Sequence, residues 1–211
     1  TISGNCTVTG TFSYTGATGL LTIGGNLAVS GIFTNAGGGT LVNGSVDLLG
    51  TGNINFNNGN FTAGTTFTMS GTSTISDGTT TGNNVFTGLV TVGSGCTFSN
   101  ATASIPYDFR GGITNNGTFS ITGGTCSFTT SNQVLQGNLF TINTTVVGAG
   151  ITVSSSGAVP LTFGATLTLN GNVDFTGAGT TTLNATAMSG AGNAIFQTLS
   201  LNGGTNTQTG T

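Results

Sequence analysis

The segment Leu27-Ala28-Val29-Ser30-Gly31 decides the fold that the sequence predicts, because its pattern of apolar, any, apolar, any, Gly returns along the chain. Clear copies are Cys6-Thr7-Val8-Thr9-Gly10, Val46-Asp47-Leu48-Leu49-Gly50, Phe67-Thr68-Met69-Ser70-Gly71, Tyr107-Asp108-Phe109-Arg110-Gly111 and Leu167-Thr168-Leu169-Asn170-Gly171. Weaker copies end at Gly88, Thr130, Gly148, Gly190 and Gly210. Successive copies end 17 to 23 residues apart, with a mean of 20. A fixed period of this length is the signature of a stacked repeat protein.

Each period contains about three short segments in which apolar and polar residues alternate, such as 27–31, 32–34 and 40–42. Alternation of this kind predicts strands with one buried face, and the Gly, Asn and Ser that close each segment suit tight corners. We therefore expect an all-β fold, a single-stranded β-solenoid (parallel β-helix) of about ten coils of ~20 residues. One continuous domain over 1–211 is expected, right-handed, triangular and uncapped at both ends. A β-sandwich or jelly roll is the competing fold.

The two apolar positions of the pattern are expected to point inward and to form columns of core residues in successive coils. These core columns are Cys6, Val8, Leu27, Val29, Val46, Leu48, Phe67, Met69, Tyr107, Phe109, Cys126, Phe128, Leu167 and Leu169. Cys96 is placed likewise, before Phe98. With Cys6 and Cys126 six coils apart, we expect free core thiols, an intermolecular disulfide being the alternative.

The composition restricts the chemistry available to this chain. Among 211 residues there are 39 Gly, 46 Thr, 23 Asn and 18 Ser, and the charged residues are only four Asp and one Arg. A net charge of -3 offers no basic surface, so nucleic acid is not an expected partner. No apolar run approaches the ~18 residues of a membrane span, so no membrane partner is expected either.

No enzymatic site emerges from the ionisable residues. Asp47, Asp77 and Asp174 fall in separate coils, and the chain has no His. Asp108 and Arg110 stand two apart in one strand, which predicts a surface ion pair. We therefore expect no enzyme, no catalytic residues, no metal site and no cofactor.

Ice binding is considered because flat β-solenoid faces with regular Thr-x-Thr ladders can bind ice. In this chain the middle position of the repeated pattern is mixed, and the ladder is therefore expected to fail. The residues at that position are Thr7, Ala28, Asp47, Thr68, Asp108, Ser127 and Thr168. Ice binding is kept as the less favoured alternative function.

Three phrases of the sequence resemble those of a known group of proteins. They are Gly25-Asn26-Leu27-Ala28-Val29-Ser30-Gly31, Asn116-Gly117-Thr118-Phe119-Ser120-Ile121-Thr122-Gly123-Gly124 and Thr166-Leu167-Thr168-Leu169-Asn170-Gly171-Asn172-Val173-Asp174-Phe175. They resemble the low-charge Gly/Thr/Asn-rich β-helical repeats of bacterial surface and secreted proteins: adhesins, autotransporter passengers and giant repeat proteins exported by Bacteroidota. The resemblance implies an extracellular or cell-surface stalk, fibre or adhesin.

The expected function is a structural component of an extracellular filament or surface fibre that assembles by end-to-end β-solenoid stacking. The expected partner is a second copy of the chain in a head-to-tail homopolymer, with other surface components or a glycan as further partners. The alternative is a ligand-binding adhesin module on a β-helical stalk. Tyr14, Phe56 and the irregular stretch 101–108 are its candidate residues.

Overall fold

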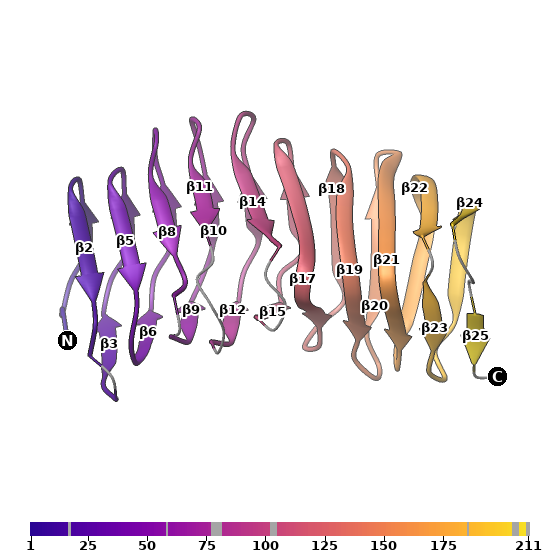
Figure 1. Ribbon diagram of the computed structural model, residues 1–211, viewed down its shortest axis with the longest axis horizontal. Helices are drawn as coiled ribbons and strands as arrows, with labels where there is room; N and C mark the ends of the chain where they lie inside the picture. Colours follow the sequence, from indigo (N-terminus) through magenta and orange to yellow (C-terminus); the bar gives the residue numbers. More distant parts are fainter. Residues whose placement is uncertain are drawn as a thin grey trace.

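The computed structural model describes residues 1–16, 18–57, 59–76, 82–101, 105–184, 186–203 and 207–209. Asp77, and Gly210 at the end of the last weaker copy of the pattern, lie outside this part of the chain. The described residues form an all-β solenoid without helices, in which the chain winds from one end to the other (Figure 1). There are about nine turns of ~21 residues, against the expected ten of ~20.

Three stacks of parallel strands form the walls of the solenoid, and we name each after its first strand. The β1 stack contains β1 (Cys6–Val8), β4 (Leu27–Val29), β7 (Val46–Leu48), β10 (Phe67–Met69), β13 (Val90–Val92), β16 (Ile113–Asn115), β18 (Gln133–Gly137), β20 (Thr152–Ser156) and the first parts of β22 (Asn172–Asn184) and β24 (Ala194–Asn202). The β2 stack contains β2 (Thr11–Tyr14), β5 (Ile32–Asn35), β8 (Asn53–Asn55), β11 (Thr74–Ser76), β14 (Thr97–Asn100), the first parts of β17 (Thr118–Phe128), β19 (Phe140–Val147) and β21 (Val159–Leu169), and the last parts of β22 and β24. The β3 stack contains β3 (Leu20–Ile23), β6 (Gly39–Val42), β9 (Phe61–Ala63), β12 (Asn84–Phe86), β15 (Pro106–Phe109), the last parts of β17, β19 and β21, then β23 (Ala187–Ser189) and β25 (Thr207–Thr209).

The register in the first turns is the expected one. Leu27 pairs with Cys6 on one side and with Val46 on the other, in parallel strands. Every strand pairing in the described part of the chain is parallel and joins one turn to the next, which a sandwich of antiparallel strands does not allow. The solenoid prediction is therefore confirmed.

The expectation that all copies of the repeated pattern form one continuous column is wrong. Phe67 of the β1 stack pairs with Val90, so the column does not continue to the copy that ends at Gly88. That copy, Asn84–Phe86, belongs to the β3 stack and pairs with Tyr107–Phe109. The core residues from Cys6 to Met69 therefore line one stack, and those from Tyr107 to Leu169 line another. Strands of all three stacks alternate apolar and polar residues and end in small residues, so the pattern alone does not identify the stack.

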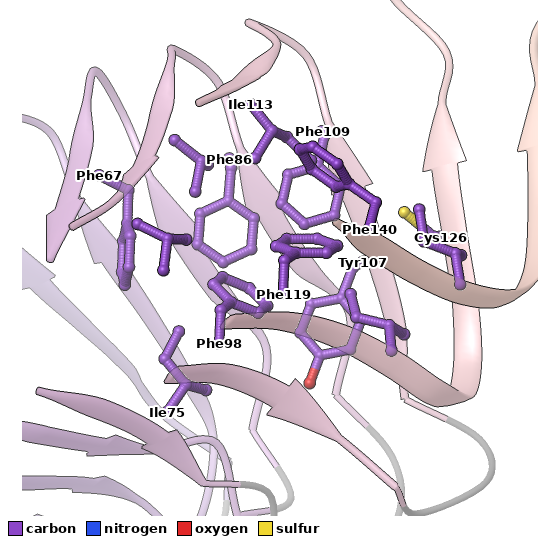
Figure 2. Close-up of a cluster of buried hydrophobic side chains, with 14 of the residues drawn as sticks. Phe67, Ile75, Phe86, Phe98, Tyr107, Phe109, Ile113, Phe119, Cys126 and Phe140 are labelled. Carbon is purple, nitrogen blue, oxygen red and sulfur yellow. The ribbon is translucent and has the colours of Figure 1, made fainter. Parts of the chain in front are cut away.

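The interior is filled by apolar side chains that converge from all three stacks. Except for Cys6, which is half-buried, every residue expected in the core columns is buried. The middle of the solenoid holds a cluster of aromatic rings (Figure 2). Phe98 of β14 lies at its centre, with its ring centroid 5.1 to 6.3 Å from those of Phe67, Phe86, Tyr107, Phe109 and Phe119.

Glycines allow the turns to stack closely at the corners. Gly71 has a φ of 75°, and a Cβ added there would lie 2.5 Å from the carbonyl oxygen of Gly50 in the preceding turn. Such a backbone conformation favours glycine over residues with a Cβ. The corner therefore needs glycine both for its conformation and for the approach of the next turn.

All three cysteines are free. Cys96 and Cys126 are buried, and Cys6 is half-buried in the first turn. Burial raises the pKa of the Cys126 thiol well above its usual value, and the nearby Asp108 carboxylate adds to that rise. The Cys96 and Cys126 thiols thus belong to the core, whereas Cys6 packs against it from the first turn.

Candidate functional surface

The outward side of the β2 stack carries small polar residues in most of the described turns. We call this set the hydroxyl column; it consists of Ser13, Thr34 and Asn55 in the first turns and of Ser99, Ser120, Thr141, Thr162, Thr182 and Ser200 in the later ones. Five consecutive pairings connect Ser99 to Ser200, and every member of that run is Ser or Thr.

The local sequence explains why the hydroxyls share one face. In Thr97-Phe98-Ser99 and Thr118-Phe119-Ser120, the Phe is buried while the flanking residues are at least partly exposed. Because side chains alternate between the two faces of a strand, a buried Phe places its neighbours on the outer face. Thr74, Thr97 and Thr118 pair in register and form a second, parallel column beside the first.

This outer face has no charge and no aromatic ring among its described residues. The second column is interrupted by the apolar residues Ile32, Leu139 and Pro160, whereas the hydroxyl column itself has no apolar member. The four Asp and the Arg of the chain are all placed elsewhere or outside the described part. The described part of this face thus presents mainly hydroxyl and amide groups.

Not all hydroxyls of this face are free, since Ser200 donates to Asn202 Oδ1 at 3.3 Å and Thr74 accepts from Asn53 Nδ2 at 2.7 Å. Within the described residues, Ser99, Ser120, Thr141, Thr162 and Thr182 have no side-chain hydrogen bond to protein. The β1 stack is different, since Gln136 donates to the Thr114 hydroxyl at 2.7 Å and Ser156 donates to the Gln136 amide oxygen at 3.4 Å. In the described residues, the run from Ser99 to Thr182 on the β2 stack thus consists of hydroxyls without a side-chain partner.

The residues considered for an ice ladder in the sequence do not lie on this face. Thr7, Ala28, Asp47 and Thr68 belong to the β1 stack, and Asp108, Ser127 and Thr168 to the β3 stack. Their columns are mixed, as expected. The repeated pattern that ends in Gly does not reveal the hydroxyl column, because in the first turns the column lies in the segment after that Gly. The repeated Thr-Phe-Ser triplets were the signal that could have found it.

Asp108 and Arg110 form the expected ion pair, with 2.7 Å between Nε and Oδ2. The expectation that both residues are on the surface is wrong for Asp108, which is only 8 % exposed. Its strand lies between Val85 and Ser127 of the adjacent turns, and the Thr129 hydroxyl also donates to its carboxylate at 2.8 Å. The carboxylate is thus held by two partners in a structural cluster.

The aromatic residues considered for an adhesin site are not presented to a ligand. Phe56 is buried in the core, and Tyr107 is buried in the aromatic cluster. Tyr14 is partly buried and packs against the core. Residues 102–104 of the irregular stretch lie outside the described part of the chain.

Within the described residues, no group of His, Cys, Asp or Glu is arranged to hold a metal ion. The same part of the chain contains no helix long and apolar enough to cross a membrane. No protein-family model, curated protein or solved structure matched this chain.

Proposed function

We propose that this chain is a structural rod segment of an extracellular filament or surface fibre, extended by end-to-end stacking of β-solenoid turns. The observation that carries the proposal is the stacking of successive turns through parallel strands. The first and last described turns pair with their neighbours in the same parallel way as the internal ones, so a further turn can pair with either end.

The inward side chains of the end turns support this axial extension. In β24, Leu199 is 44 % and Leu201 59 % exposed, although they pair with the buried Thr181 and Leu183. At the other end, Phe12 is only partly buried. A further turn, supplied by the same polypeptide or by a second copy, would cover these apolar groups and gain backbone hydrogen bonds.

The surface chemistry is consistent with a passive rod outside the cell. With only five charged side chains in 211 residues, the stability of the fold should depend little on salt concentration. Hydrogen bonds between paired strands hold the turns together instead. The resemblance to bacterial surface and secreted repeats supports the location. Digestion of the chain by protease added to intact cells, and its recovery in the surface fraction, would test that part of the proposal.

Assembly is tested by electron microscopy and sedimentation of the purified chain over a range of concentrations. We expect unbranched rods whose length increases with concentration, because a heterologous end-to-end contact does not close. The double variant Leu199→Lys/Leu201→Lys places charges on the apolar end and should abolish the growth. The matched control is Ile195→Lys in the same strand, since Ile195 is 53 % exposed but pairs with the outward Asp174.

Circular dichroism of both variants checks that the solenoid is retained. A wild-type chain that stays monomeric at high concentration would contradict self-assembly. Equal loss of assembly in the Ile195→Lys control would show that the contact is lateral rather than axial.

A further inference from the structure

We propose that Asn202 is a site of spontaneous deamidation, and that this modification stops the growth of the filament at the end that carries it. The chemical part of the proposal stands on the structure of one corner. The part that concerns growth rests on the proposed function, because Asn202 closes β24, the strand that presents Leu199 and Leu201 to a further turn.

Asn-Gly pairs are chemically labile because glycine, which has no side chain, lets its backbone nitrogen reach the carboxamide of the preceding asparagine. The described residues contain four such pairs, which begin at Asn43, Asn116, Asn170 and Asn202. All four asparagines are exposed. Exposure alone therefore does not distinguish between them.

The backbone amides of the four glycines do distinguish them. Three donate a hydrogen bond: Gly44 to the Gly25 oxygen at 3.0 Å, Gly171 to the Val147 oxygen at 3.2 Å and Gly117 to Asn115 Oδ1 at 3.1 Å. Within the described residues, the N–H of Gly203 has no such partner. Its nitrogen can therefore attack a carbonyl carbon without first breaking a hydrogen bond.

The space around the glycines differs in the same way. A Cβ added at Gly44, Gly117 or Gly171 would overlap atoms of the preceding turn. At Gly203 the nearest described atom would be Asn184 Oδ1, at 3.1 Å. The peptide between Asn202 and Gly203 thus has room to close a ring, and the three internal corners lack it.

The carboxamide of Asn202 also has a hydrogen-bond donor beside it. Ser200 donates to Asn202 Oδ1 at 3.3 Å. A donor on this oxygen stabilises the negative charge that develops there when the nitrogen attacks the carboxamide carbon. Ser200 should therefore accelerate the ring closure.

The reaction needs water as its only co-reactant. The Gly203 nitrogen bonds to Cγ of Asn202, the bond from Cγ to Nδ2 breaks, and ammonia leaves with the proton that the Gly203 nitrogen gives up. Water then opens the cyclic succinimide at either of its two carbonyl groups. The product at position 202 is an aspartate, or an isoaspartate in which the main chain passes through the side-chain carbons.

Both products change the end of the solenoid. Isoaspartate lengthens the main chain by one atom, which displaces the N–H and C=O groups that a further turn would pair with. Both also place a negative charge next to Leu201, which is exposed. The number of ends that can grow should therefore fall with time.

The first test follows the modification in the purified chain at mildly alkaline pH. Samples taken over days are digested with pepsin and analysed by mass spectrometry, and an isoaspartate-specific methyltransferase labels one of the products. We expect position 202 to convert at least about fivefold faster than positions 43 and 170, because the glycine amides there must first give up a hydrogen bond. Ser200→Ala should slow the conversion at 202 by about threefold.

The control is the same incubation in concentrated guanidinium chloride, because unfolding removes the differences between the corners. All four pairs should then convert at similar rates. Conversion at 43 and 170 as fast as at 202 in the native protein would overturn the proposal. So would a position 202 that is the fastest in the unfolded chain as well.

The second test measures rod growth by sedimentation before and after ageing, in the wild type, Asn202→Gln and Asn43→Asp, with circular dichroism as the check of folding. The wild type should lose growth in proportion to its conversion at 202. Asn202→Gln keeps an amide but must close a larger ring, so it should keep its growth. Asn43→Asp places a charge on an internal corner and should grow like the fresh wild type.

Conversion at 202 without a loss of growth would overturn the role in growth. A fresh wild-type chain that forms no rods would overturn the proposed filament and this role with it, whereas the first test would still establish or refute the modification of Asn202.

Discussion

Replacement of Phe98 by Ala should destabilise the solenoid more than any change on its surface. Phe98 is 0 % exposed, and its ring lies among the aromatic rings that come from all three stacks (Figure 2). Truncation of a buried Phe to Ala removes the transfer free energy of the ring and leaves a cavity, at a cost of about 3 to 5 kcal/mol. Because the neighbouring rings belong to fixed strands and cannot collapse into the space, we expect about 4 kcal/mol or more.

Chemical denaturation followed by far-ultraviolet circular dichroism measures this change in the free energy of unfolding. Ser99→Ala is the matched control, since Ser99 is the next residue of the same strand and points outward; its effect should stay within about 0.5 kcal/mol. Phe98→Leu should fall between the two. A loss below about 1.5 kcal/mol in Phe98→Ala would refute the argument that the aromatic cluster is tightly packed.

Three further outcomes are expected. Gly71→Ala should lower the free energy of unfolding by about 1 to 3 kcal/mol, because Gly71 has a φ of 75° and the Gly50 oxygen lies close to where the new Cβ would be. Gly10→Ala is the control and should cost much less, since no atom lies within 4 Å of its added Cβ; chemical denaturation compares the two variants. In the native protein a thiol reagent should label the half-buried Cys6 before the buried Cys96 and Cys126, as mass spectrometry of the labelled peptides can show, and reductant should leave the melting temperature unchanged. Rapid labelling of all three cysteines would contradict the burial of Cys96 and Cys126. Hydrogen bonds from the Thr176 side chain and backbone lower the pKa of Asp174 from 3.8, so the stabilising contribution of its carboxylate should be present above pH 3.8 and lost as the pH falls through the lowered pKa. Acid unfolding of Asp174→Asn should lack this component, and an acid-unfolding profile identical to that of the wild type would contradict the prediction.

The solenoid itself could be predicted from the sequence because strand alternation and turn residues are local signals. Leu27 illustrates this, since its pattern and its spacing to Cys6 and Val46 give the correct register. The later assignment of that pattern to stacks failed at Gly88, after the shortest interval of 17 residues. The sequence of a three-residue strand does not indicate which stack the strand belongs to, because all three stacks bury alternate residues against the same core.

The candidate surface was less predictable for the same reason. The residues of one face are about 21 apart in the sequence and come together only when the strands are correctly paired. Assigning a strand to the wrong stack therefore groups it with a different set of outward side chains. For Asp108, the strand pattern predicted the direction of the side chain but not its burial. Its outward position in the strand was read correctly, but its burial depends on Thr129 and Arg110, and the Thr129 partner comes from the next turn.

The parallel pairing of successive turns also determines how the rod resists force. Strands lie across the long axis, so the backbone hydrogen bonds that join the turns point along it (Figure 1). A pull on the two ends loads these bonds directly and one turn after another, as in opening a zipper, rather than in shear over many bonds at once. The tensile strength of the rod is then that of its weakest turn and does not increase with length. Compression, in contrast, presses the turns together and is opposed by the packed aromatic interior.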